Sequence, residues 1–134
     1  MEFHRGRLID HVHLRVKDLA ASKRFYRAVL ATVGVNIQHE SDTAFAADEL
    51  YVDAADDYVT HLHLAFQART REDVHAFHAA GLANGGTDNG KPGERPYHPG
   101  YYAAFILDPD GNNIEAVHHG PNVRSAVDVT ITPT

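Results

Sequence analysis

The sequence predicts an α+β fold made of two similar modules, each with the element order β-α-β-β-β. The first observation is a repeated pattern of polar residue, His, apolar residue, His and Leu, found at residues 10–16 and 60–66. The second is that each copy leads into a helical pattern that ends at glycine, with Phe25 and Phe77 in similar places. The two spacings, 50 residues from His11 to His61 and 52 between the phenylalanines, indicate a duplication.

The first module is expected over about residues 8–57. After its first strand, a helix is predicted over residues 18–33, because Asp18 is a suitable N-cap and the apolar residues that follow recur at helical spacing. Gly34 ends this helix. Strand-like segments then follow at residues 35–39, 43–47 and 50–54.

The second module is expected over residues 58–119. Its helix, residues 70–84, has Thr70 as N-cap and two acidic residues in the positive first turn. Strands are predicted at residues 101–107 and 113–118, joined by a Pro- and Gly-containing turn at 108–112. Residues 84–100, rich in Gly and Pro, are predicted to be a long loop, and the tail at 120–134 contains a strand-like alternation at 127–132.

Composition excludes several classes of function. The 134 residues carry a formal charge of −6, which argues against nucleic acid or an anionic membrane as a partner. The N-terminus lacks the apolar core of a signal peptide, so a cytoplasmic location is expected. The chain has no Cys and 11 His, so any metal must be held by His and carboxylates.

Strand periodicity places the candidate site residues on shared faces. His11 and His13 share one face of the first strand, and His61 and His63 share one face of the matching strand. Glu115 lies on a third strand, the last of the second module. The predicted helices can cover the opposite, apolar faces. Two histidines and a carboxylate on one concave face are typical of a divalent metal site with open positions for substrate or oxygen.

Three motifs carry a resemblance to the vicinal oxygen chelate superfamily, which includes glyoxalase I, extradiol dioxygenases, fosfomycin-resistance enzymes and bleomycin-resistance proteins. The opening motif is His11-x-x-Leu14-Arg15-Val16-x-Asp18-Leu19-x-x-Ser22-x-x-Phe25-Tyr26-x-x-x-Leu30. The second module opens with Thr60-His61-x-x-Leu64, and the last hairpin reads Asp108-Pro109-Asp110-Gly111-Asn112-x-Ile114-Glu115. The resemblance implies a single domain whose modules form a curved, open mixed β-barrel around a metal, with the helices outside.

Carried over to this sequence, the resemblance implies His11, His61 and Glu115 as ligands of a divalent metal: Fe, Mn, Zn, Ni or Co. Family members often have a fourth ligand on the last strand of the first module, and Tyr51 occupies that position here. The glyoxalase I pattern has a carboxylate there, so this sequence departs from it. Three protein ligands resemble the extradiol dioxygenases or the fosfomycin-type thiol transferases. Proteins of the bleomycin-resistance type typically lack these ligands.

Further side chains are candidates for the same cavity. His13 and His63 can support the ligands, act as acid–base catalysts or line the cavity. The segment at residues 97–102 offers phenol and imidazole donors to an ionising substrate oxygen, or packs on the barrel rim. The catalytic candidates are therefore His13, His63, His98 and Tyr102, and the substrate-binding candidates are Tyr51, Tyr97 and Tyr101.

The sequence therefore predicts a metal-dependent enzyme that binds a small molecule through adjacent oxygens, with dioxygenase-like chemistry favoured. Glyoxalase or lyase activity and fosfomycin-type thiol transfer are the alternatives within the enzymes. A metal-free antibiotic-binding protein is the alternative outside them. The resemblance also implies a homodimer.

Overall fold

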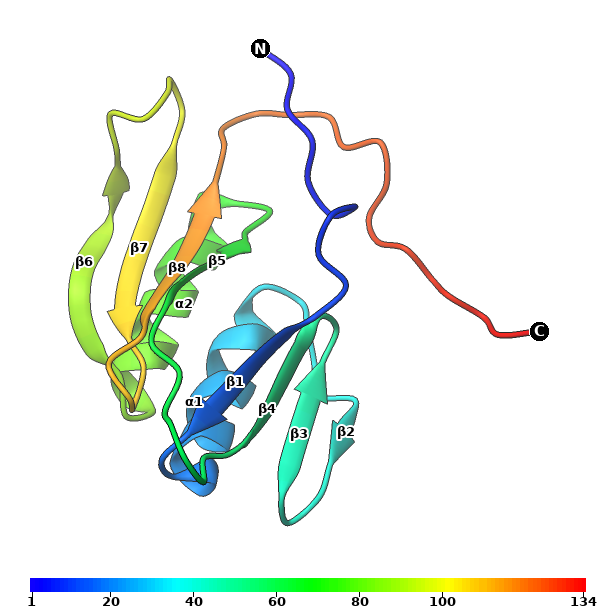
Figure 1. Cartoon of the computed structure of the whole chain (residues 1–134). Helices are drawn as coiled ribbons and strands as arrows, with labels where there is room; N and C mark the ends of the chain where they lie inside the picture. The colour runs from blue at the N-terminus through cyan, green and yellow to red at the C-terminus, as the bar shows by residue number, and fades with distance from the viewer.

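The computed structural model describes all residues from 1 to 134 and contains two four-stranded mixed sheets (Figure 1). The first sheet has the strand order β1-β4-β3-β2 and the second has the order β5-β8-β7-β6. In each, the first strand of the module runs parallel to the last, and the remaining pairs are antiparallel. The strands of the first sheet are β1 (Val12–Val16), β2 (His39–Glu40), β3 (Ala44–Ala47) and β4 (Leu50–Ala54). Those of the second are β5 (His63–Gln67), β6 (Thr87–Glu94), β7 (Tyr102–Leu107) and β8 (Asn113–His118). The predicted α+β fold with two β-α-β-β-β modules is confirmed.

Both helices begin at the predicted caps. The Asp18 side chain accepts a hydrogen bond of 3.0 Å from the backbone N–H of Ala21 and starts α1 (Leu19–Thr32). The Thr70 hydroxyl does the same for the N–H of Asp73, at 3.0 Å, and starts α2 (Arg71–Ala83). Each side chain satisfies one of the free donors in the first turn.

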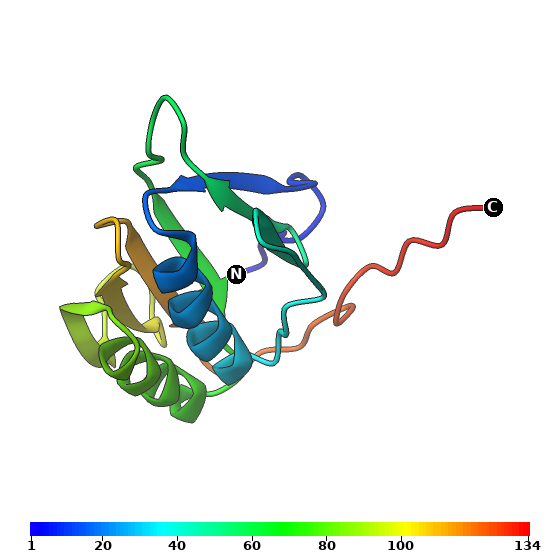
Figure 2. The ribbon, with the colours of Figure 1, turned by 90° about the horizontal axis from the view of Figure 1, so that it is seen from below.

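The helices pack against each other, so that one core runs through both modules (Figure 2). Phe25 of α1 and Phe77 of α2 are fully buried in it, together with Val52 of β4 and Ile114 of β8. Each helix covers the apolar face of its own sheet and leaves the other face open. The two sheets share no strand pairing, so the barrel is not closed within one chain.

A buried hydrogen bond ties the first module to the last hairpin. Tyr26 of α1 is fully buried, and its hydroxyl donates to Asp108 Oδ2 at 2.5 Å. Asp108 also accepts from the backbone N–H groups of Asp110 and Asn112 and from the Asn112 amide, at 2.8–3.0 Å. The carboxylate therefore organises the turn that precedes β8.

Three sequence predictions are wrong in their extent. Residues 87–94, expected inside a loop, form the edge strand β6, whose register shifts on both sides of Gly90; Gly and Pro are tolerated at such bulges and edges. Of the strand expected at 35–39 only His39 lies in a strand, β2. Residues 127–132 form no strand, because the tail leaves the body without a neighbouring strand to pair with (Figure 1).

Neither helix has the length and apolarity needed to cross a membrane.

Candidate functional site

Glu115 lies on the open face of the second sheet and is the most buried acidic residue of the chain. Only 2% of the residue is exposed. Its Oε2 accepts a hydrogen bond from His63 Nε2 at 2.9 Å, and its Oε1 accepts one from the Tyr101 hydroxyl. Because two donors offset the cost of burial, the carboxylate is stable between the apolar residues Ile114 and Ala116. Burial, followed by the bond to Glu115, raises the pKa of Tyr101, so its hydroxyl keeps its proton.

The strand registers decide which histidine of the second module corresponds to His11. In the first sheet, Tyr51 lies opposite His13, two residues beyond His11. In the second sheet, Glu115 lies opposite Ala65, two residues beyond His63. When Leu50-Tyr51-Val52 is aligned with Ile114-Glu115-Ala116, His11 aligns with His63, at the 52-residue spacing that the two helix N-caps share.

His61, which the sequence pattern put forward, precedes β5 and is exposed. The structure brings His63 rather than His61 to the Glu115 carboxylate. The helix N-caps and the two phenylalanines repeat at 52 residues, a spacing that pairs His11 with His63. The pattern of alternating histidines repeats at 50 residues, a spacing that pairs His11 with His61.

The open face of the first sheet has its own set of polar contacts. His11, immediately before β1, is exposed and its Nδ1 donates to Asp10 at 2.6 Å. His13 Nε2 donates to Asp53 Oδ1 at 2.8 Å, and its ring lies 5.0 Å from that of Tyr51. The His13 side chain is thus held by the neighbouring strand.

The segment at residues 97–101 packs beside Glu115 through a cluster of rings. His98 Nδ1 donates to the Pro99 carbonyl at 2.9 Å, so the Nε2 of a neutral His98 accepts from His119 Nδ1, also at 2.9 Å. This arrangement leaves His119 Nε2 as a free acceptor. Burial and the neighbouring His98 lower the pKa of His119, which favours the neutral ring. Tyr97 and Tyr101 pack edge to face against each other at 4.9 Å.

Tyr102 lies on the other side of the second sheet. Its hydroxyl is 2.6 Å from His75 Nε2 of α2, and the Arg71 guanidinium lies 4.4 Å from its ring centre. Since strand neighbours point to opposite faces, Tyr101 and Tyr102 are separated by the sheet. Of the two, only Tyr101 contacts Glu115.

His63 and Glu115 are two adjacent residues that could bind a metal ion, and the chain brings no third donor to them. His63 and Glu115 are of the types that bind borderline and hard divalent ions, and they are adjacent. No three His, Asp or Glu side chains of the chain form a group that could hold a metal. His11 precedes β1 of the other sheet and is not part of this pair.

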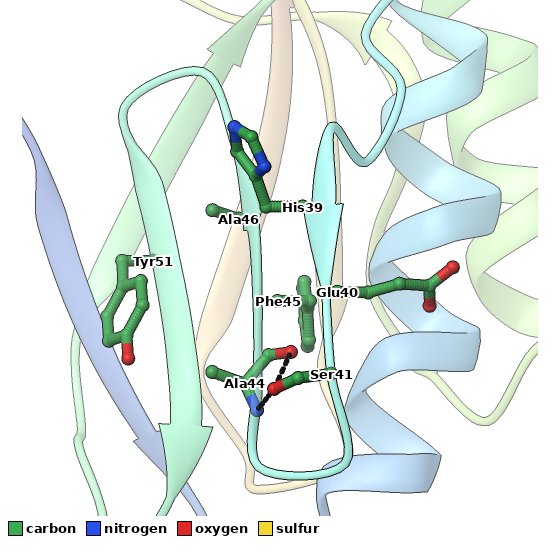
Figure 3. Close-up of a pocket in the computed structure, with 7 residues that line it drawn as sticks. All are labelled: His39, Glu40, Ser41, Ala44, Phe45, Ala46 and Tyr51. Carbon is green, nitrogen blue, oxygen red and sulfur yellow. Dashed lines mark hydrogen bonds between the residues drawn. The ribbon is translucent and has the colours of Figure 1, made fainter.

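A shallow cavity of about 150 Å³ lies on the open face of the first sheet, next to Tyr51 (Figure 3). Ala44 and Ala46 of β3 form its floor, and Tyr51 and His39 stand on the same side of the strands. The Glu40 side chain points away from the cavity to α1, where its Oε2 accepts a hydrogen bond from Arg27 Nη2 at 2.7 Å.

Comparison with known proteins gives a consistent result. The family described as the Glyoxalase/Bleomycin resistance protein/Dioxygenase superfamily matches residues 8–116. A glyoxalase/bleomycin resistance protein from Albidiferax ferrireducens T118 is 35% identical, with a TM-score of 0.74 over 84% of this chain and 98% of that one. No curated protein matches the chain.

Two more distant structures share the fold. A glyoxalase-related enzyme from Fulvimarina pelagi is 19% identical, with a TM-score of 0.67 over 90% of this chain and 99% of that one. A lactoylglutathione lyase from Agrobacterium tumefaciens is 22% identical, with a TM-score of 0.60 over 81% of this chain and 91% of that one. With its paired β-α-β-β-β modules and its match over most of its length, the chain belongs to the glyoxalase/bleomycin resistance protein/dioxygenase superfamily.

Proposed function

We propose that the chain is a metal-dependent enzyme that binds a small molecule through two adjacent oxygens. The observation that carries the proposal is the contact between His63 and Glu115, where a buried carboxylate meets an imidazole at 2.9 Å on an open sheet face. Of the ligands expected from the sequence, we retain His11 and Glu115 and replace His61 by His63, because the register equates His63 with His11.

The active form in this proposal is a homodimer that assembles the site from both chains. His11 of one chain joins His63 and Glu115 of the other, which supplies the two imidazoles and one carboxylate of a facial site. The open polar faces, the unjoined sheets and the lack of three donors in one chain all support a shared site. A bound divalent ion would polarise the substrate and stabilise negative charge that develops on its oxygens.

The surrounding side chains then have defined tasks. Tyr101 holds one oxygen of Glu115 and fixes the orientation of the carboxylate. His119 Nε2, free and neutral, is suited to accept a proton from a substrate hydroxyl. Tyr51 takes the place that Glu115 has in the second sheet, so the site has a phenol rather than a second carboxylate.

Dioxygenase-like ring cleavage remains the favoured reaction, because two imidazoles and one carboxylate would leave a bound ion accessible to substrate and oxygen. Glyoxalase or lyase chemistry and thiol transfer are the other enzymatic outcomes. A metal-free binding protein for small molecules is the second candidate. It is favoured by one observation, that both oxygens of Glu115 are already satisfied by protein donors.

The experiment is metal analysis of protein purified without an affinity tag and loaded with Fe(II), Mn(II) or Zn(II). The wild type is expected to retain the ion stoichiometrically, His63→Ala to lose it, and His61→Ala to retain it. Oxygen uptake with catechol then tests ring cleavage, and methylglyoxal with glutathione tests the lyase branch. Absence of stoichiometric metal in the wild type would favour the metal-free binding protein.

A further inference from the structure

Two histidines that are not among the proposed metal ligands lie side by side at the end of the second sheet. His98 belongs to the segment before β7, and His119 directly follows β8. The segments that carry them touch at Gly100 and Gly120, which both have positive φ, and a Cβ on Gly100 would lie 3.3 Å from Gly120 Cα. Because only glycine allows the two backbones to come this close, the pair of histidines is held together by the local fold.

The two imidazole rings meet edge to edge. His98 Nε2 and His119 Nδ1 are 2.9 Å apart, the ring centres are 5.1 Å apart, and the ring planes differ by only 20°. Rings that lie one over the other keep their atoms about 3.5 Å apart or more, so this short contact is a hydrogen bond close to the plane of both rings. The lone pair of an imidazole nitrogen lies in the ring plane, so a proton can move along this line.

The Pro99 carbonyl determines which nitrogens of the pair carry hydrogen. A carbonyl only accepts, so His98 Nδ1, 2.9 Å away, carries hydrogen and the Nε2 of a neutral His98 is an acceptor. His119 then carries its hydrogen on Nδ1, and its Nε2 has a free lone pair. A proton that binds His119 Nε2 makes this ring a cation. The Nδ1–H bond of His119 can then break as an N–H bond forms on His98 Nε2, which moves the positive charge to His98.

The surroundings disfavour a lasting positive charge on the His119 ring itself. Burial, followed by the neighbouring His98, lowers the pKa of His119. The Phe3 ring of the N-terminal segment packs edge to face on His119 at 4.7 Å and restricts the access of water. On His98 the same charge lies beside the Pro99 carbonyl oxygen, which already accepts from this ring. The other charged or titratable groups near the His119 ring are Arg5, His118, Glu115 and Tyr101.

We propose that His98 and His119 form a proton relay, in which His119 Nε2 accepts a proton and His98 takes over the positive charge. His98 is a positioning residue, since it acts through His119 and fixes the tautomer of that ring. The relay lies next to the proposed metal site, because the His119 ring packs at 5.4 Å on the ring of Tyr101, whose hydroxyl donates to Glu115. Taking the proton from a substrate hydroxyl rests on the proposed function, whereas the relay itself needs no metal.

The test is NMR spectroscopy of metal-free protein labelled with ¹⁵N in the histidine rings, since the nitrogen signals report which nitrogen carries hydrogen. At about pH 8, where histidine is ordinarily neutral, both His98 and His119 are expected to carry hydrogen on Nδ1. During acid titration the first proton taken up should shift the ring signals of both histidines together, because they share it. A His119 protonated on Nε2 at about pH 8, or two rings that titrate without a response to each other, would overturn the proposal.

Two variants of His98 distinguish the relay from a contact that only supports the fold. His98→Gln keeps an acceptor for His119 Nδ1 but cannot take up a proton, so the tautomer should persist and His119 should titrate alone. His98→Phe removes the acceptor, so His119 should lose its preference for hydrogen on Nδ1. His39→Phe, on β2 of the other sheet, is the matched control and should leave the His119 signals unchanged. An unchanged His119 tautomer in a folded His98→Phe protein would refute the relay. Failure of the wild type to bind metal would instead refute the proposed function.

Discussion

Replacing Tyr26 by Phe tests whether the two modules form one cooperative unit. The Tyr26 hydroxyl is the donor from α1 to Asp108, which organises the turn before β8. Burial and the nearby Asp108 raise the pKa of Tyr26, so the hydroxyl is protonated and donates throughout the neutral range. Phe keeps the ring and its packing and removes only this bond.

The magnitude follows from the partners that remain. A hydrogen bond to a charged group contributes about 1.5–3 kcal/mol to stability. Asp108 keeps three other donors, at 2.8–3.0 Å, so the cost should fall in the lower half of that range, at about 2 kcal/mol. For a domain of this size the melting temperature should fall by about 5–8 °C.

Urea denaturation, monitored by circular dichroism, measures the loss of unfolding free energy in Tyr26→Phe. The midpoint should decrease while the m-value stays constant, because the surface exposed on unfolding is the same. Tyr97→Phe is the matched control: the residue is 66% exposed, and the change should alter stability by less than about 0.5 kcal/mol. Equal stabilities of the two variants would refute the role assigned to Tyr26.

Three further changes have outcomes that follow from the packing and the charges. Gly86→Ala should cost about 1–3 kcal/mol of unfolding free energy, since its Cβ would lie 2.5 Å from Ile106 Cγ2 and 2.8 Å from Phe25 Cε2; urea denaturation measures it. The hydrogen bond from His78 lowers the pKa of Asp88, so this carboxyl stabilises the fold above its unfolded pKa of about 4 and ceases to do so as the pH falls. His78→Gln should therefore shrink the loss of stability between about pH 6 and about pH 3, whereas an unchanged loss would contradict the assignment. Removing residues 121–134, all exposed, should change the free energy of unfolding by less than about 0.5 kcal/mol, as tested on the truncated chain.

The helices and the last hairpin could be predicted because their signals are local. Asp18 and Thr70 cap the helices by bonds to residues three positions on, and Asp108 organises its own turn. Strand β6 could not be predicted in the same way. Its Gly and Pro residues disfavour a strand, and only pairing with β7 makes them one. The alternation at residues 127–132 shows the converse, a strand pattern with no neighbouring strand to pair with.

The candidate site was predictable in its chemistry but not in its register. The sequence singled out Glu115 and four strand histidines, and the choice between His61 and His63 depended on which residue lies opposite Glu115. Pairing between β5 and β8 brings His63 to Glu115, whereas the repeats at 50 and 52 residues in the sequence do not choose between the two histidines.

The central claim is that His11 of one chain and His63 of another serve the same metal ion. Mixing His11→Ala and His63→Ala chains, unfolding them together and refolding them forms mixed dimers in which one of the two sites keeps both histidines. The shared site predicts that each variant alone binds no metal and that the mixture recovers it, as measured by metal analysis of the isolated dimers. A mixture that stays metal-free, or a His11→Ala protein that still binds stoichiometric metal, would contradict it.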